Sequence, residues 1–152
     1  MSPHLLSAIA TIGPVGFLRP APGTWGSLAG VVSGVALITL APFALELAII
    51  LLAIIGTRAA SAYQQQTGKK DASEVVVDEV VGQWIPLLII PMTPVWILAA
   101  FVLFRFFDIT KLGPIGMAEN WPGGFGVMAD DVIAGAAAAI ILIVVQIGLG
   151  VW

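Results

Sequence analysis

The stretch Lys69–Trp84, which reads KKDASEVVVDEVVGQW, decides how this chain is organised. It holds four of the nine acidic residues of the chain and runs directly into an apolar segment. Carboxylates at the edge of a hydrocarbon segment cost free energy unless they are hydrated, paired or bound to a cation. The acidic side chains of this stretch therefore need hydration, an ion-pair partner or a bound cation at the membrane surface.

The composition is typical of an integral membrane protein. Of the 152 residues, 59% are hydrophobic and only 10% are charged, whereas a soluble domain carries about 25% charged residues. The length predicts a single domain over residues 1–152. Six basic residues and a net charge of −3 leave no basic surface for nucleic acid. The absence of cysteine excludes thiolate chemistry, and the one histidine, His4, lies near the N-terminus.

Two apolar segments before the stretch predict a helical hairpin. They cover residues 28–40 and 43–62, with a break at Ala41-Pro42, and small residues in the first favour close helix packing. Four glycines and three prolines in residues 13–27 should prevent a regular helix there. Residues 1–12 could form a short interfacial helix.

The apolar run after the stretch predicts a second hairpin with its tip at residues 91–94. Each arm then has about 15 residues, or about 22 Å, which is short of the roughly 20 residues of a full crossing. Arg105 and Lys111 at its far end mark the cytoplasmic side, as Arg58, Lys69 and Lys70 do at the polar segment 63–70.

A last apolar segment, residues 131–151, has the length of one crossing. The expected fold is therefore all-α: a polytopic membrane bundle of about five membrane helices, including two hairpins, with cytoplasm-facing acidic loops. The N-terminus would be cytoplasmic and the C-terminus outside. Gln146, in the middle of the last segment, is expected to hydrogen-bond another helix.

The two-hairpin topology would bring the polar clusters to one face of the membrane, whereas a single crossing would separate them. The clusters are Thr24 and Ser27; Glu74, Asp78 and Glu79; Arg105, Asp108 and Lys111; and Asp130 with Asp131. Convergent carboxylates form a candidate site for a hard divalent cation, which prefers oxygen ligands.

Asp71, Glu74 and Asp78 have the spacing of one helix face, with Glu79 one step round. Favourable interaction with the helix dipole would account for Asp71 and Glu74. Asp78 and Glu79 would lie two turns into the helix, against the apolar run, which favours a metal-binding or catalytic role.

Arg105, Asp108 and Lys111 lie three residues apart. They could form a ladder of ion pairs within one helix or, through Arg105 and Lys111, bind a phosphate. Asp108 stands among apolar neighbours and is a further candidate acid.

The glycine-rich residues 122–131 are expected to form a loop that runs into a helix, where backbone N–H groups such as that of Gly124 could bind a phosphate. Asp130 and Asp131 would stand at the helix start, and capping needs only one of them. The pair therefore favours a cation ligand. Thr24 and Ser27 are most simply helix caps, with a phosphate contact as the second possibility.

Three groups of residues together resemble the phosphatidylglycerophosphatase A family. They are residues 21–28 (APGTWGSL), residues 73–84 (SEVVVDEVVGQW), and residues 104–111 (FRFFDITK) with 123–131 (GGFGVMADD). The likeness runs through almost the whole chain in the order of the family. One departure is Leu112-Gly113-Pro114, where the family usually has Pro-x-Pro.

The resemblance implies a Mg²⁺-dependent lipid phosphatase of the bacterial inner membrane, active in phospholipid biosynthesis. Such enzymes convert phosphatidylglycerophosphate to phosphatidylglycerol, so the partners would be this phospholipid and the bilayer. The expected metal ligands are Glu74, Asp78, Glu79, Asp108, Asp130 and Asp131. All of these except Glu74 are also the expected catalytic residues. Phosphate binding is expected from Arg105, Lys111, Thr24, Ser27 and Gly124.

Two alternatives of other classes stay open at this point. A small divalent-cation transporter would place its acids near the middle of the bilayer. A non-catalytic membrane assembly subunit would use the glycine-rich segments for packing. The sequence also leaves open the oligomeric state, and whether a carboxylate acts as general base or as a nucleophile.

Overall fold

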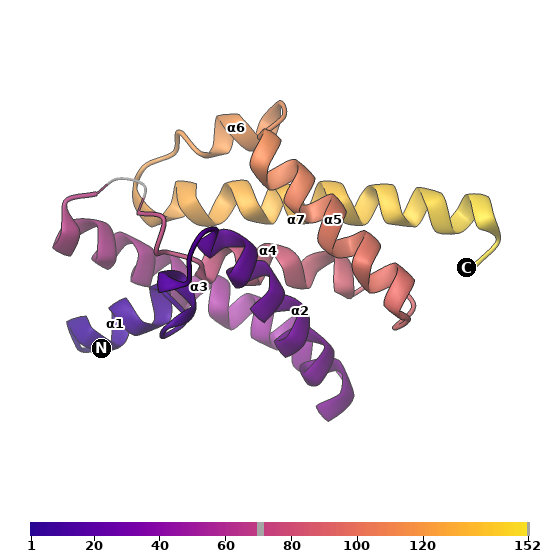
Figure 1. Cartoon of the computed structure of the whole chain (residues 1–152), viewed down its shortest axis with the longest axis horizontal. Helices are drawn as coiled ribbons and strands as arrows, with labels where there is room; N and C mark the ends of the chain where they lie inside the picture. The colour runs from indigo at the N-terminus through magenta and orange to yellow at the C-terminus, as the bar shows by residue number, and fades with distance from the viewer. Residues whose placement is uncertain (70–71, 152) are drawn as a thin grey trace.

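The computed structural model describes residues 1–69 and 72–151, and in this part of the chain the regular structure is entirely helical (Figure 1). The elements are α1 (Pro3–Ala10), the 3₁₀ turn η1 (Val15–Phe17), α2 (Pro22–Leu40), α3 (Ala44–Thr67), α4 (Val77–Leu87), α5 (Pro94–Thr110), α6 (Pro114–Ala118) and α7 (Gly123–Leu149). The expected all-α architecture is confirmed.

Helix α4 is the centre of the bundle. Helices α2, α3, α5 and α7 all pack against it, and nine of its 11 residues are buried. Its sequence is apolar on nearly every side because protein surrounds it on nearly every side. Trp84 is fixed by two hydrogen bonds to α2, from its indole nitrogen to the Gly30 carbonyl (2.9 Å) and to Ser33 Oγ (3.1 Å).

Glycines allow the neighbouring helices to lie close to α4. A methyl group at Gly34 of α2 would lie 2.7 Å from Leu87, and one at Gly82 of α4 would lie 2.6 Å from the Asp131 carbonyl oxygen. A methyl group at Gly135 of α7 would overlap the Gly82 carbonyl oxygen. Close helix packing through small residues, expected for the first apolar segment, is therefore confirmed and extends to α7.

The chain reverses direction between α2 and α3 and again between α4 and α5. Residues of both turns, 41–46 and 87–92, line one cavity, so the two tips lie at the same end of the bundle. Gln146, near the end of α7, donates to the Ile89 carbonyl (3.1 Å) at that end, which confirms its expected interhelical hydrogen bond. The other end of the bundle therefore collects the end of α3, the start of α4, the end of α5 and the first turns of α7.

Three helices of the described part are long and apolar enough to cross a membrane: α2, α3 and α7. The expected number was about five. Helix α4, with 11 residues, extends only about 16 Å, and it is enclosed by protein instead of facing lipid. Helix α5 has 17 residues and lies across α7 (Figure 1). The second hairpin is present as a chain reversal, but its first arm is an interior helix.

The expectation that residues 13–27 contain no regular helix is wrong for their last part, because α2 begins at Pro22. Proline is favoured in the first turn of a helix, where its missing N–H would have no partner and its fixed φ fits. Thr24 and Ser27 are consequently inside α2 and are not caps. The Ser27 hydroxyl donates to the Gly23 carbonyl one turn back (2.8 Å).

The expected series of acids along one helix is also wrong. Helix α4 begins at Val77, so Glu74 precedes it, and Asp78 and Glu79 stand in its first turn instead of two turns inside. Asp71 lies outside the described residues. Conversely, α7 begins at Gly123, so Asp130 and Asp131 lie two turns inside the helix and cannot be its caps.

The close packing of α4 and α7 predicts the effect of one substitution. Gly135→Ala should lower the stability of the folded chain by about 1–3 kcal/mol, because the added methyl group must displace the backbone of α4. The measurement is the thermal unfolding midpoint in detergent. Gly148→Ala, in the same helix but with nothing within 4 Å of the added carbon, is the matched control. Equal midpoints for the two variants would contradict this packing.

Candidate active site

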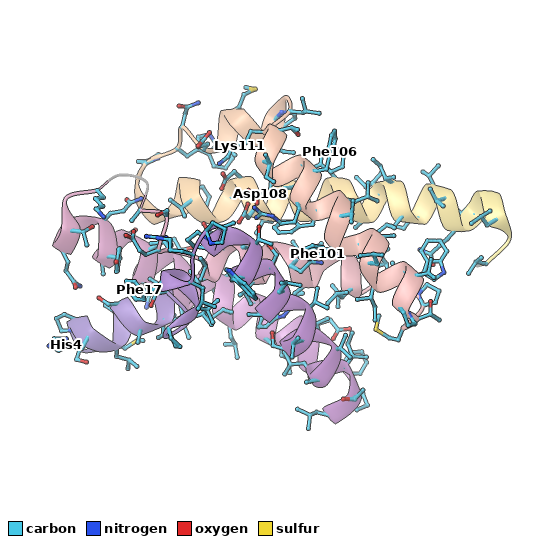
Figure 2. The ribbon with its side chains drawn as sticks, in the orientation of Figure 1. His4, Phe17, Phe101, Phe106, Asp108 and Lys111 are labelled. Carbon is cyan, nitrogen blue, oxygen red and sulfur yellow. The ribbon has the colours of Figure 1, made fainter. Side chains whose placement is uncertain are left out.

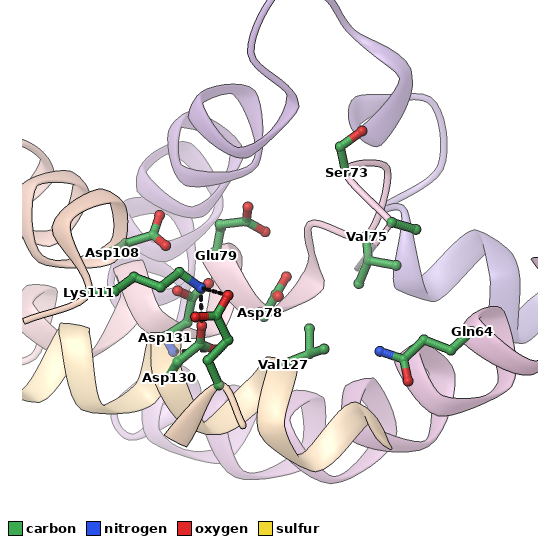
Figure 3. Close-up of a pocket in the computed structure, with 12 residues that line it drawn as sticks. Gln64, Ser73, Val75, Asp78, Glu79, Asp108, Lys111, Val127, Asp130 and Asp131 are labelled. Carbon is green, nitrogen blue, oxygen red and sulfur yellow. Dashed lines mark hydrogen bonds and ion pairs between the residues drawn. The ribbon is translucent and has the colours of Figure 1, made fainter. Parts of the chain in front are cut away.

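A cavity of about 310 Å³ opens at the end of the bundle where α4 begins (Figure 3). Its lining residues come from α3, α4, α5, α7 and the segments that join them. They are Gln64, Ala72, Ser73, Val75, Asp78, Glu79, Asp108, Lys111, Glu119, Val127, Asp130 and Asp131. Six of the twelve are acidic and one is basic, so carboxyl groups dominate the cavity lining.

Three elements supply the central carboxylates. The first turn of α4 carries Asp78 and Glu79, the last turn of α5 carries Asp108, and the interior of α7 carries Asp130 and Asp131. Carboxylate oxygens of Asp78, Glu79 and Asp131 all lie within 4.8 Å of one another. Two chain reversals and the glycine contacts between α4 and α7 thus bring together acids that are far apart in the sequence.

These carboxylates are largely excluded from water. Asp78 is 8% exposed and Asp131 is 3% exposed. Within the described part of the chain, Asp78 Oδ1 and Glu79 Oε2 are buried and have no hydrogen-bond partner. Three convergent carboxylates, with a buried and unpaired oxygen on Asp78, offer the oxygen ligands that a hard divalent cation prefers, so the residues present fit such an ion.

The same burial changes the protonation of the α4 acids. Burial, followed by the charge of Glu79, raises the pKa of Asp78 well above its usual range. Burial also raises the pKa of Glu79 to about 8, with further contributions from the charges of Asp131 and Asp108. Without a cation, this part of the cavity therefore holds protons at neutral pH.

Lys111 is the one basic side chain among the described residues that line the cavity. It ends α5 in the left-handed conformation (φ 47°), and its Nζ lies 2.5 Å from Asp130 Oδ2 and 3.1 Å from Glu119 Oε1. Burial opposes its positive charge, but the hydrogen bond and charge of Asp130 outweigh this and raise the pKa of Lys111 above its usual value. The ammonium group is therefore a permanent positive charge at the cavity wall.

Arg105 and Asp108 form an ion pair within α5, and Arg105 also donates to Ser27 Oγ (3.4 Å). The expected ladder within one helix is therefore correct for this pair. It is wrong for Lys111, which reaches across to α7. Figure 2 shows Asp108 and Lys111 on the side of α5 that faces the bundle, with Phe106 on the outside and His4 far away at the start of α1.

Several expected site residues are not part of the cavity lining. Glu74 instead lies near two basic side chains, Lys69 at 3.3 Å and Arg19 at 3.7 Å. The Gly124 amide donates to Ser61 Oγ (2.9 Å), so its N–H already has a partner. Thr24 and Ser27 lie on α2, outside the lining as well, although Ser27 touches Arg105.

Two residues near the site carried no clear signal in the sequence. Glu119 reaches Lys111 because the short helix α6 turns the chain back toward α5. No local sequence pattern predicts this turn. Gly23 lies so close to the site that a methyl group there would be 2.5 Å from Glu79 Oε1 and 3.2 Å from the Arg105 guanidinium. The glycine-rich composition of residues 13–27 is the signal that could have indicated this close approach.

Comparison with known proteins identifies relatives over most of the chain. The profile of the family described as Phosphatidylglycerophosphatase A matches residues 8–146. Phosphatidylglycerophosphatase A of Haemophilus influenzae is 43% identical over 134 residues, which is 86% of this chain and 82% of that protein. The Escherichia coli protein of the same name is 38% identical over 124 residues, covering 80% of this chain and 72% of that protein.

A Bacteroides thetaiotaomicron protein provisionally named a phosphatidylinositol-3-phosphatase is 42% identical over 143 residues, or 89% of each chain. No solved structure matches the chain.

The raised pKa of Glu79 predicts how stability depends on pH. The pKa of Glu79 is 4.5 in the unfolded chain and about 8 in the folded chain. At pH values between these two, the folded chain keeps a proton on Glu79 that the unfolded chain has lost. Without a cation, stability should therefore fall as the pH rises through this range, by up to about 1.4 kcal/mol per pH unit for one group. Added Mg²⁺ should stabilise the chain most at the alkaline end, because it competes with the proton.

Thermal unfolding midpoints in detergent from about pH 5 to about pH 8, in EDTA and in Mg²⁺, measure both effects. Glu79→Gln is the control and should reduce the pH dependence in EDTA, leaving the contribution of Asp78. A wild-type midpoint in EDTA that rises with pH over this range would show that these acids are not held protonated.

Proposed function

The chain belongs to the phosphatidylglycerophosphatase A family, and from this premise we propose that it hydrolyses the terminal phosphomonoester of phosphatidylglycerophosphate, giving phosphatidylglycerol and phosphate. The family match over residues 8–146 and the two relatives of that name support this chemistry. The observation that carries the assignment to a site is the cluster of Asp78, Glu79 and Asp131, whose oxygens lie within 4.8 Å of one another.

We propose Mg²⁺ as the cation of this cluster, held by Asp78, Glu79 and Asp131. The proposal is supported by the hard oxygen ligands, the burial of two of the three residues and the unpaired Asp78 Oδ1. When bound, Mg²⁺ supplies neutralisation of the negative charge on the phosphate oxygens. Asp108 and Asp130 border the cluster, and each is engaged by a basic side chain.

Lys111 and Arg105 are the candidate phosphate-binding side chains. Each is held by a carboxylate, Lys111 by Asp130 and Arg105 by Asp108, which orients its remaining N–H groups. Charge-assisted hydrogen bonds from both to the non-bridging oxygens would orient the phosphorus atom toward the acids. The sequence left open whether Arg105 and Lys111 form ion pairs within one helix or bind a phosphate. We propose the phosphate-binding role for both.

A carboxylate that is not engaged with the cation would then act on the phosphate. Asp108 is the candidate, since its Oδ2 is paired with Arg105 and it lines the cavity beside Glu79 and Asp131. In one route Asp108 removes a proton from the attacking water, whose oxygen bonds to phosphorus as the bond from phosphorus to the glycerol oxygen breaks, and the proton passes to that leaving oxygen. In the other route Asp108 itself attacks phosphorus and displaces the glycerol oxygen, which takes up a proton, and water then hydrolyses the aspartyl-phosphate to release phosphate and free Asp108. Both routes use the same residues.

We further propose that the protein is a multi-pass protein of the bacterial inner membrane with its active site on the cytoplasmic face. Three apolar helices support the membrane location. Arg105 and Lys111 lie at the cavity end of the bundle, whereas the hairpin tips, residues 40–46 and 87–96, contain no lysine or arginine. This asymmetry is the one expected for a cytoplasmic cavity end. A phospholipid headgroup at that surface could enter the cavity while its acyl chains stay in the bilayer.

A second candidate substrate is a phosphatidylinositol monophosphate. The relative from Bacteroides thetaiotaomicron favours it, because its provisional name refers to removal of a phosphomonoester from such a lipid. Both substrates carry a phosphomonoester on a lipid headgroup, so the same acids and basic residues would serve. Phosphate release from each lipid, compared under identical conditions, separates the two.

The test of the proposed function is phosphate release by the purified chain from phosphatidylglycerophosphate in mixed micelles. Asp78→Asn and Asp130→Asn should each lower kcat/KM by about 100-fold or more, and EDTA should abolish release. Glu46→Gln is the matched control, because Glu46 lines the cavity between the hairpin tips at the other end. Release that persists in both variants, or in EDTA, would contradict the assignment.

A further inference from the structure

Gln83 is a buried polar residue that the proposed reaction does not yet use. It is 0% exposed, and neither its amide nitrogen nor its amide oxygen has a hydrogen-bond partner among residues 1–69 and 72–151. Burial of an unpaired amide costs free energy, and most buried polar groups in proteins are paired. A completely buried amide with both atoms unpaired therefore points to a function.

Gln146 shows that this bundle can satisfy a buried amide. It is 3% exposed, and its Nε2 donates to the Ile89 carbonyl (3.1 Å) and to the Leu142 carbonyl (3.2 Å). Gln146 thus joins two helices far from the acidic cavity. Gln83 makes no such bond, and it lies one helical turn from Glu79.

Glu79 and Gln83 lie side by side against α2. A methyl group at Gly26 would be 3.4 Å from the Glu79 Cβ, and one at Gly30 would be 3.0 Å from the Gln83 Cβ. Glycines one turn apart on α2 therefore face residues one turn apart on α4. Ser27, between these glycines, accepts a hydrogen bond from Arg105 of α5. Glu79, Gln83 and the Arg105 guanidinium consequently all border the same segment of α2, residues 23–30.

The unpaired atoms of these three residues are complementary. Glu79 Oε2 and Gln83 Oε1 are acceptors, whereas Gln83 Nε2 and Arg105 Nε are donors, and all four are buried without partners in the described chain. Two donors and two acceptors can form two hydrogen bonds with Gln83 in the middle. A glutamine amide can accept from a guanidinium through its oxygen and donate to a carboxylate through its nitrogen at once.

We propose that Gln83 is a positioning residue for the cation site, which accepts from Arg105 Nε and donates to Glu79 Oε2 when the other Glu79 oxygen holds the cation. This inference rests on the proposed cation site. Gln83 and Glu79 are four residues apart on α4 and are therefore neighbours on its surface. The Arg105 guanidinium lies against Gly23 and Ser27 on the same stretch of α2 that Glu79 and Gln83 face. The arrangement orients Glu79 and links it to Arg105, the candidate phosphate ligand. Such supporting hydrogen bonds set the orientation of metal ligands.

The test compares Gln83→Leu with Gln146→Leu in the full chain in detergent, using Mg²⁺ alone as the probe. Isothermal titration calorimetry gives the Mg²⁺ affinity, and thermal unfolding in EDTA gives the stability of the metal-free fold. Gln83→Leu should weaken Mg²⁺ binding by about 10-fold or more, with an unfolding midpoint in EDTA no lower than that of the wild type. Gln146→Leu should show the reverse: a lower midpoint and an unchanged Mg²⁺ affinity.

A positioning role is overturned if Gln83→Leu binds Mg²⁺ within twofold of the wild type, or if its midpoint falls as far as that of Gln146→Leu. Should Gln83→Leu fail to fold, Gln83→Met, which is unbranched and similar in length, enters the same comparison. Wild-type protein that releases phosphate but binds no Mg²⁺ would overturn both the cation site and this inference. Wild-type protein that binds Mg²⁺ without releasing phosphate would overturn the proposed function and leave the Gln83 comparison decisive.

Discussion

Exclusion of carboxylates from water at the start of α4 is the constraint on which the rest of the bundle depends. Asp78 and Asp131 are almost completely buried, and Glu79 adds a buried oxygen without a partner in the described chain. Such groups are tolerated when they are protonated or when a cation compensates their charge. Packing of the surrounding helices holds these acids together, which lowers the stability of the folded chain. A cation that binds the folded chain would restore part of this stability.

The packing around α4 shows how the chain keeps this arrangement. Glycines at 26, 30 and 34 let α2 approach one side, and Gly82 and Gly135 let α7 approach another. With both neighbours so close, the first turn of α4 and the interior of α7 are forced into contact at their acids. The apolar residues of α4 that follow Asp78 and Glu79 in the chain, among them Val81 and Leu87, pack in the core and anchor the helix. Glycine contacts and apolar burial thus place the polar site.

Much of this arrangement could be predicted from the sequence. Apolar segments with proline breaks indicated the chain reversals, and the reversals implied that Asp78, Asp108 and Asp130 would meet, which they do at the cavity.

The position of the acids within their helices could not be predicted, because helix starts depend on tertiary contacts: α4 begins only at Val77 and α7 already at Gly123. The interior position of α4 could not be predicted either, because an apolar segment has the same sequence pattern whether lipid or protein covers it. Lys111 and Gln83 have roles set by neighbours on other helices, which periodicity along the chain does not record.

The central claim is that Asp78, Glu79 and Asp131 form a cation site, and that the nearby acid Glu74 does not belong to it. Electron paramagnetic resonance of Mn²⁺, titrated into the purified chain in detergent, tests this directly, because bound Mn²⁺ loses the signal of the free ion. We expect saturable Mn²⁺ binding by the wild type and by Glu74→Gln, and loss of binding in the double variant Asp78→Asn with Asp131→Asn. Unchanged binding by the double variant, or loss of binding in Glu74→Gln, would contradict it.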